Sequence, residues 1–276
     1  TEGLNYFQIP ITQVAPIDFE AVLFNGGVTA QTNVALNAEV NGGVFTGSSD
    51  PITIGSLGID TIGLSTQFTP DAIGNYTVVQ SITADSLDDV PSNNEIANIS
   101  FSVVDYIYAR DNNDVGGSTS NGTDGFEAGN LFDIWADQTL KGIDVRIPGG
   151  TNGVTAGTEF FVKIYSLDTE GEFIYENESD PVLVTQQMLN TSQTIELLFP
   201  TDLFANTTYL AVVGSYEEGF RVSTAGASDP QTSFFLDLAD NTWYYQTGTP
   251  FVRLNFDPTI GLQENSSSFK VGNVFP

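Results

Sequence analysis

The sequence predicts an all-β protein in which an Ig-like β-sandwich is followed by a jelly-roll β-sandwich. Three observations lead to this prediction. Apolar residues alternate with polar ones in many short segments, turn-forming residues recur about every ten positions, and a second set of such segments begins after residue 105. Because 276 residues suffice for two domains with separate cores, we expect domains at 1–105 and 106–257, a linker at 258–268 and a final element at 269–276.

The first domain is expected to consist of short antiparallel strands. Segments 33–40, 76–84 and 99–103 carry apolar residues at alternate positions, as one buried face of a strand requires. Turn-forming stretches separate the segments: NGG at 25–27 and 41–43, SSDP at 48–51 and TPDAIGN at 69–75. Nothing before residue 105 has the spacing of a helix of useful length.

The second domain is expected to contain about eight strands, joined by long glycine-rich loops that are typical of a jelly roll. Two of them are 139–147, with an irregularity near Gly142, and 160–167, which is apolar enough for both faces to be covered. The other strand-like segments are 195–199, 208–216, 233–238 and 251–256. Trp243 follows the turn-forming ADN and is expected to close a hairpin, whereas 181–190 favours a short helical turn.

Acidic residues greatly outnumber basic ones. The chain has 35 Asp and Glu against seven Lys and Arg, and no base precedes Arg110. Such a surface repels phosphate backbones and anionic lipids, which excludes nucleic acids and membrane surfaces as partners. No apolar run reaches the roughly 18 residues that a membrane span requires, so we expect no membrane insertion. The acidic surface is either simply well solvated, which we favour, or attracts a cation.

Cysteine and histidine are both absent. Their absence excludes disulfides, thiol chemistry, Ser-His-Asp and Cys-His catalysis, and zinc sites built on histidine. Pairs of carboxylates are inevitable among 35 acids, so they carry no signal for glycoside hydrolysis. We therefore predict that the chain is not an enzyme.

A glycine-rich loop between residues 111 and 127 carries candidate metal ligands. They are Asp111, Asn113, Asp114, Asp124 and Glu127. Hard oxygen ligands on a flexible loop suit Ca²⁺, although the spacing differs from that of an EF-hand. The alternative is that the Asp and Asn side chains bond to their own backbone in turns. A bound Ca²⁺ would be structural and would staple the second domain.

Aromatic residues are the second group of candidates. Trp135, Trp243 and Tyr244, together with Tyr216 and Tyr245, offer rings on which sugars can stack, with acidic neighbours to accept hydrogen bonds from hydroxyl groups. Jelly-roll domains commonly bind carbohydrates in this way. The alternative, which we favour for Trp243, is packing within or across strands.

Several stretches resemble parts of one protein family. The final FKVGNVFP is similar to the opening of the type A C-terminal sorting domain of type 9 secretion substrates of Bacteroidota, here expected to be truncated because no Asn-Pro follows Pro276. NYFQIPITQVAPIDFEAVLFNGG and GNYTVVQSITADSLDDVPSNNEIANISFSV resemble the Ig-like or adhesion-type sandwiches of these proteins. FEAGNLFDIWADQTLKGIDVRI and NTWYYQTGTPFVRLNF resemble the jelly-roll module that often precedes the sorting domain.

The resemblance implies an extracellular or outer-membrane surface protein, exported by the type 9 secretion machinery through the adjoining sorting domain. It implies a non-catalytic role in adhesion, in contact with glycans or surface polysaccharide, or as a spacer. The alternative is an accessory C-terminal region of a secreted peptidase or glycosidase whose catalytic domain lies before Thr1. Thr61 in DTI and Ser86 in DSL also resemble the O-glycosylation pattern of Bacteroidota and are candidate acceptors.

Overall fold

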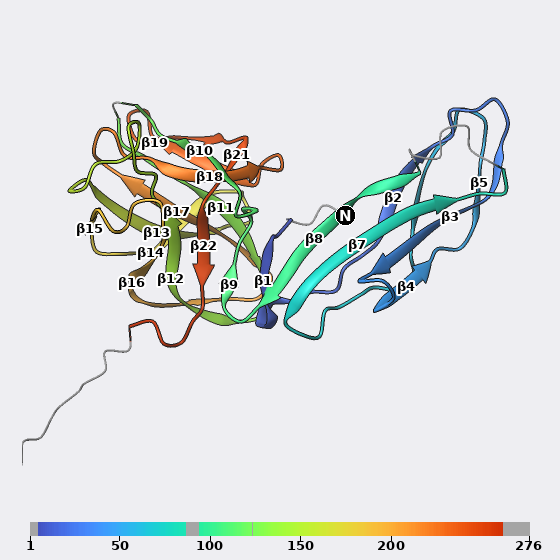
Figure 1. The fold of residues 1–276 in the computed structure, drawn as a ribbon, viewed down its shortest axis with the longest axis horizontal. Coiled ribbons are helices and arrows are strands. Elements are labelled where there is room, and N and C mark those ends of the chain that lie inside the picture. Colours follow the sequence, from blue (N-terminus) through green and yellow to red (C-terminus); the bar gives the residue numbers. More distant parts are fainter. Residues whose placement is uncertain (1–4, 87–93, 123, 262–276) are drawn as a thin grey trace, which may run out of the picture.

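The computed structural model describes residues 5–86, 94–122 and 124–261, and nearly all of its regular structure is β-strand. Figure 1 shows two β-rich units side by side, with strands β1 to β8 in the N-terminal unit and β9 to β22 in the C-terminal unit. The described part contains one helical element, the 3₁₀ turn η1 at Ile11–Gln13, and none of its helices could span a membrane. The predicted all-β sandwich class is confirmed.

The N-terminal unit packs a six-stranded sheet against a two-stranded sheet. The larger sheet has the order β1-β8-β7-β3-β4, with β5 also paired to β3, and the smaller sheet pairs β2 with β6. The strands are β1 (Gln8–Pro10), β2 (Glu20–Phe24), β3 (Gln31–Val40), β4 (Phe45–Ser48), β5 (Ile52–Ile54), β6 (Ile59–Gly63), β7 (Gly74–Thr83) and β8 (Glu95–Val104).

The core of this unit contains the side chains that the alternating pattern selects. Leu36 and Val40 on β3 are fully buried, while the residues between them alternate in exposure as predicted. Ala21 and Ile62 reach the same core from the smaller sheet. Alternation therefore places one face of each strand against the opposite sheet.

The C-terminal unit packs a seven-stranded sheet against a four-stranded sheet and adds a three-stranded sheet. Their orders are β14-β13-β17-β11-β19-β20, with β15 on β13; β16-β12-β22-β9; and β10-β18-β21. The strands are β9 (Ile107–Tyr108), β10 (Val115–Thr119), β11 (Phe126–Ile134), β12 (Gln138–Arg146), β13 (Glu159–Leu167), β14 (Phe173–Glu178), β15 (Val182–Leu183), β16 (Ser192–Leu203), β17 (Thr207–Ser215), β18 (Val222–Ala227), β19 (Ser233–Asp237), β20 (Thr242–Tyr245), β21 (Gly248–Pro250) and β22 (Val252–Asn255).

Local predictions for this unit mostly hold. The register of β12 against β16 shifts between Leu140 and Gly142, at the expected irregularity, and β19 and β20 form the hairpin expected at Trp243. The helical turn expected at 181–190 is wrong. Val182 and Leu183 instead pair with the start of β13, and turns follow, because pairing with a buried strand outweighs the weak helical spacing.

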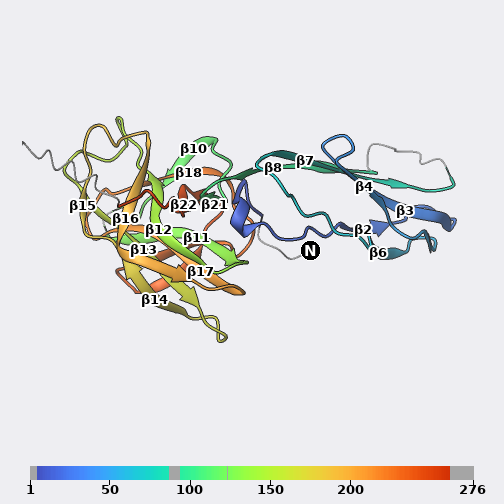
Figure 2. The ribbon, with the colours of Figure 1, turned by 90° about the horizontal axis from the view of Figure 1, so that it is seen from below.

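The two faces of the seven-stranded sheet are both covered, as predicted for 160–167. Its inner face contributes Phe160, Val162 and Ile164 of β13 to the main core. Its outer face carries a separate apolar cluster in which Leu131, Leu210 and Val212 lie under aromatic side chains. Figure 2 shows β13, β14 and β17 of this sheet along the lower side of the C-terminal unit, with β10 and β18 on its upper side.

Residues 5–13 lie between the two units and contact both. β1 runs parallel to β8, and Gln8 also forms an isolated bridge with Ala109 of the C-terminal unit. The buried Gln13 accepts a hydrogen bond from the backbone N–H of Trp135 at 2.9 Å and donates to the carbonyl of Ala136 at 2.9 Å. This segment therefore ties the two units together.

The sheets themselves divide between Val104, where β8 ends, and Ile107, where β9 begins. The expected linker is described only as far as residue 261, where the chain forms a turn. Residues 262–268 of that linker and the expected element at 269–276 lie outside the described residues.

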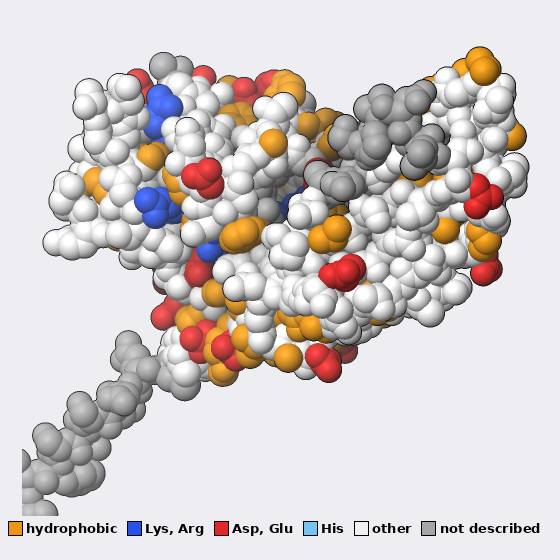
Figure 3. Space-filling model, turned by 45° about the vertical axis from the view of Figure 1, so that its right-hand side comes forward, with side chains coloured by type: hydrophobic (Ala, Val, Ile, Leu, Met, Phe, Trp, Pro, Cys, Tyr) orange, Lys and Arg blue, Asp and Glu red, His pale blue; other side chains and the backbone are white. Residues whose placement is uncertain are grey.

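Charge is distributed unevenly over the two units. In the view of Figure 3, Lys and Arg side chains are visible on the C-terminal unit and none is visible on the N-terminal unit. This agrees with the sequence, in which Arg110 is the first base. The N-terminal unit therefore presents acidic groups without any basic side chain of its own.

Candidate functional site

Aromatic side chains gather on the outer face of the seven-stranded sheet. We call this surface the outer aromatic face and define it by Phe161, Lys163, Tyr165, Phe173, Tyr175, Tyr216, Phe234, Trp243 and Tyr245, with Glu127 among them. Strand register brings these residues together. Tyr165 stands opposite Tyr175, and Tyr245 stands opposite Phe234, so that side chains from four strands project on the same side.

Trp243 is the packed centre of one end of this face. Its ring lies 4.9 Å from Phe173, 5.9 Å from Tyr165 and 6.4 Å from Phe234, measured between ring centroids. The interplanar angles are 65°, 85° and 81°, so all three are edge-to-face contacts. Edge-to-face contacts of this kind are the favoured arrangement of aromatic pairs. Trp243 thus holds neighbouring rings in place more than it offers its own face to solvent.

Three tyrosines of the outer aromatic face are open to solvent. Tyr175, Tyr216 and Tyr245 are 51%, 68% and 61% exposed. Each contacts another ring: Tyr165 for Tyr175, Phe161 for Tyr216 and Phe234 for Tyr245. Because each ring already has a neighbour that restricts it, and tyrosine has few rotatable bonds, these residues present ring surface and hydroxyl groups at a low cost in conformational entropy.

A buried ion pair lies within this aromatic surface. The Lys163 ammonium donates to Glu127 Oε1 at 2.5 Å, and the Tyr165 hydroxyl donates to Glu127 Oε2 at 2.7 Å. Lys163 also lies 4.4 Å from the centre of the Phe161 ring and 5.7 Å from that of Tyr216. Glu178 stands opposite Lys163 in the register of β13 and β14 and adds a second carboxylate on this side.

Electrostatics keep Lys163 charged and the Tyr165 phenol neutral at neutral pH. Burial lowers the pKa of Lys163, but Glu127 and Tyr216 together raise it more, so the pKa lies above its ordinary value and the ammonium stays charged. Burial, followed by the charge of Glu127, raises the pKa of Tyr165. That phenol therefore remains a hydrogen-bond donor to Glu127.

Two of the candidate metal ligands, Asp111 and Glu127, belong to two different ion pairs. Asp111 is fully buried and binds the Arg253 guanidinium through both oxygens, at 2.7 Å to Nε and 2.5 Å to Nη2. Asn113 accepts from the same Nη2 at 3.0 Å. Arg253 also stacks on Phe251 at 3.8 Å. Glu127, by contrast, belongs to the outer aromatic face.

The remaining loop residues show turn chemistry. The Asn113 N–H donates to Asp111 Oδ1 and the Asp114 N–H donates to Asn112 Oδ1, both at 3.0 Å, as in Asx turns. Asp124 also lies in this loop and has contacts of its own. Within residues 5–86, 94–122 and 124–261, no three acidic side chains are grouped as a metal site would require. Calcium binding by the loop stays a prediction.

That prediction has a direct test. If Ca²⁺ stabilises the loop, EDTA should lower the melting temperature of the protein, because metal binding to the folded state adds to its stability. Asp111→Ala should then remove this dependence on EDTA. Differential scanning fluorimetry with and without EDTA measures both effects. A melting temperature that EDTA leaves unchanged would rule out the structural calcium.

The other candidate residues lie apart from one another. Trp135, half exposed, follows the end of β11 at the junction of the two units. Tyr244 points to the side of β20 opposite Trp243, and its hydroxyl donates to Asp240 at 2.8 Å. Thr61 on β6 and Ser86 after β7 are both exposed, so each is accessible to modification. Their glycosylation stays a prediction.

Sequence reasoning missed Lys163, Tyr165 and Tyr175 as members of a site. The available signal was a single Lys within the aromatic stretch FFVKIY, since a charge in such a strand needs a partner when it is buried. The identity of that partner, Glu127, depends on strand order, which the sequence does not reveal.

Comparison with known proteins adds little to this geometry. No protein-family model matches the sequence, and no curated protein matches it significantly. A carbohydrate-binding module of the β-sandwich superfamily aligns with 88% of this chain and 96% of its own, at 13% identity and a TM-score of 0.24. A two-domain protein of unknown function from Bacteroides fragilis aligns with 72% of this chain and 84% of its own, at 9% identity and a TM-score of 0.19. At these TM-scores neither likeness bears on function.

Proposed function

We propose that this chain is a non-catalytic glycan-binding segment and that the outer aromatic face is its binding surface. One observation carries the proposal: the exposed Tyr175, Tyr216 and Tyr245 share a sheet face with the fixed ion pair of Lys163 and Glu127. Exposed aromatic rings that cluster on one sheet face are typical of a binding surface, whereas apolar residues scattered singly over a solvated face are not.

Sugars match the chemistry of this surface. The apolar C–H faces of a pyranose ring cover an aromatic ring, and its hydroxyl groups exchange hydrogen bonds with tyrosine hydroxyls and carboxylates. Glu178 supplies a carboxylate acceptor and the exposed tyrosine hydroxyls supply donors, while the buried pair of Glu127 and Lys163 holds the surface from beneath. The absence of His and Cys from the sequence supports binding without catalysis.

We also propose that the chain is exported by the type 9 secretion machinery and acts in adhesion at the outer-membrane surface or outside the cell. The order of the stretches that resemble such substrates supports this proposal. The serial arrangement of two β-units in Figure 1 suits a spacer that carries a binding face away from a surface. Residues 269–276, which resemble the sorting domain, lie outside the described part.

A glycan array tests the binding proposal. Tyr216→Ala is expected to weaken the selected glycan about tenfold, because a stacked ring contributes roughly 1 kcal/mol or more. Tyr244→Ala is the matched control, since Tyr244 is 48% exposed but faces the other side of β20. If the protein retains no glycan on the array, or if both variants lose glycan affinity equally, the chain acts as a spacer without a glycan site.

A further inference from the structure

A second concave site lies at the junction of the two units, away from the outer aromatic face. It is a cavity of about 380 Å³, walled by residues 13–20, by β7 and β8, and by the end of β11. Tyr6, whose ring packs on Tyr108 and Phe132 of the C-terminal unit, and Trp135 provide its aromatic walls. A volume of this size accommodates a small organic ligand.

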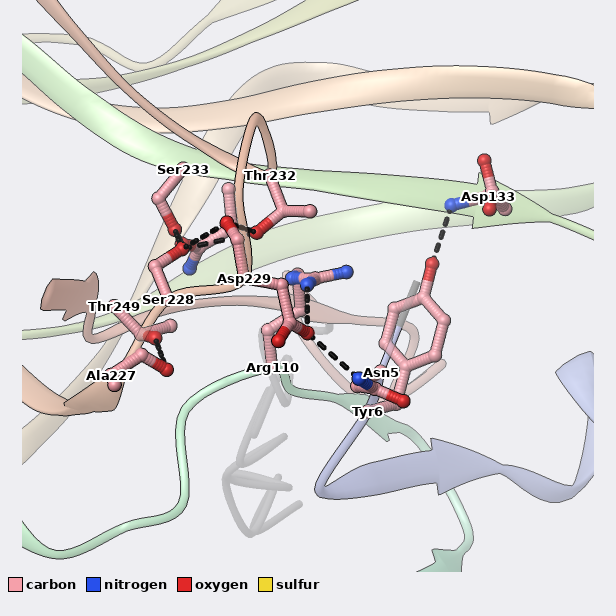
Figure 4. Close-up of polar contacts among 11 residues, drawn as sticks. Asn5, Tyr6, Arg110, Asp133, Ala227, Ser228, Asp229, Thr232, Ser233 and Thr249 are labelled. Atoms are coloured by element: carbon pink, nitrogen blue, oxygen red, sulfur yellow. Dashed lines mark hydrogen bonds and ion pairs between the residues drawn. The ribbon is translucent and has the colours of Figure 1, made fainter. Parts of the chain in front are cut away.

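The walls of the cavity are fixed by contacts across the junction. Figure 4 shows the Tyr6 hydroxyl accepting from the backbone N–H of Asp133, at 2.8 Å, and Asn5 donating to Asp229, also at 2.8 Å. The Trp135 N–H is held by Gln13. The site is therefore built in advance by residues of both units, and a ligand need not order it.

Its charged lining is of one sign. Asp18, Glu20 and Asp133 line the cavity, and no Lys or Arg is among the described residues of its wall. Arg110 packs over the Tyr6 ring, 5.4 Å from its centre, and pairs with Asp229 at 3.6 Å instead of entering the lining. Carboxylates beside aromatic rings attract a cation and reject an anion.

A buried polar side chain in the cavity wall lacks a hydrogen-bond partner. Gln80 is only 8% exposed and lines the cavity, on the same side of β7 as the core residue Val78. Its Oε1 is buried and has no hydrogen-bond partner. An orphaned buried acceptor is costly, so a donor that approached the Gln80 side chain from the cavity would be a favourable partner for it.

We propose that this cavity binds a small organic ammonium compound that also carries a hydrogen-bond donor. The cationic end lies against Trp135 and the lining carboxylates, and the donor meets Oε1 of Gln80 once that buried side chain turns toward the cavity. This site is separate from the glycan-binding face, so either one can fail without the other. Because residues from both units line it, an occupied cavity also stiffens the junction.

Choline and its neutral isostere 3,3-dimethylbutan-1-ol test the site, because they share shape and hydroxyl group and differ in charge. In the Trp243→Phe variant, Trp135 is the remaining tryptophan, and its fluorescence reports the junction directly. Choline is expected to give a saturating change and to bind about tenfold more tightly than the isostere. Calorimetry on the unaltered protein repeats the comparison without any substitution.

Matched variants separate the site from the general acidity of the protein. Asp18→Asn and Trp135→Leu should each weaken choline several-fold, whereas Asp60→Asn, which removes an exposed carboxylate of the same unit, should not. Equal affinity for choline and the isostere would overturn the proposal. A choline signal that does not saturate would also overturn it, as would equal weakening of choline binding by Asp18→Asn and Asp60→Asn. Binding of neither compound by calorimetry would mean that the cavity holds water only.

Discussion

Replacing Asp111 by Ala is expected to lower the free energy of unfolding by about 3–5 kcal/mol. Asp111 is 0% exposed, and its two oxygens neutralise the Arg253 guanidinium, which is itself 7% exposed. Removing the carboxylate leaves a buried cation without its counter-charge. Urea denaturation at neutral pH measures the loss, and a midpoint within about 1 kcal/mol of the parent protein would contradict it.

The double variant Asp111→Ala/Arg253→Met is the matched control. It removes both charges, so it should recover much of the stability lost in Asp111→Ala, because an apolar replacement of a buried ion pair is often tolerated. If Asp111 served as a calcium ligand instead, removing Arg253 would not rescue the single variant. The same two proteins therefore distinguish the ion pair from the metal that the loop composition predicts.

Local patterns predicted the strands well, because a strand with one buried face has an apolar residue at every second position. Leu36 and Val40 illustrate this on β3. The same rule separates Tyr244 from Trp243, since neighbours in a strand face opposite sides, although the sequence alone did not show which side would be crowded with aromatic rings.

Pairings between distant residues could not be predicted. Asp111 and Arg253 are 142 positions apart, and Glu127 and Lys163 are 36 apart, so each pair exists only through the order of strands in the sheets. In the sequence, the polar residues near Asp111 all belong to the same loop, so Asp111 was interpreted as a calcium ligand. The junction cavity is hidden for the same reason, because Gln80 and Trp135 meet there from separate units.

Replacing Glu127 by Gln is expected to cost about 3 kcal/mol of stability at neutral pH. Glu127 is 1% exposed and is the counter-charge of Lys163, as well as the acceptor for the Tyr165 hydroxyl. Without the carboxylate, a buried ammonium remains. Chemical denaturation gives the size of the loss, and Glu127→Gln/Lys163→Met should regain most of it.

The pH dependence of that loss distinguishes a stranded charge from a simple packing defect. In the unaltered protein the pKa of Lys163 is raised, so its stabilising contribution is complete below the unfolded pKa of about 10.4 and disappears only as pH rises through the higher folded value. In Glu127→Gln the main remaining influence is burial, which lowers the pKa. Between that lowered value and about 10.4 the unfolded chain then binds more protons, so stability rises with pH.

The difference in free energy of unfolding between the unaltered protein and Glu127→Gln should therefore decrease as pH rises from about 8 to about 9.5. The decrease is up to about 1.4 kcal/mol per pH unit. This window lies below the ordinary pKa of tyrosine, about 10, so the raised pKa of Tyr165 does not enter the comparison. Unfolding curves at several pH values measure the difference. Parallel pH profiles would show that Lys163 escapes to solvent when Glu127 is lost, and the ion pair would then not organise the outer aromatic face.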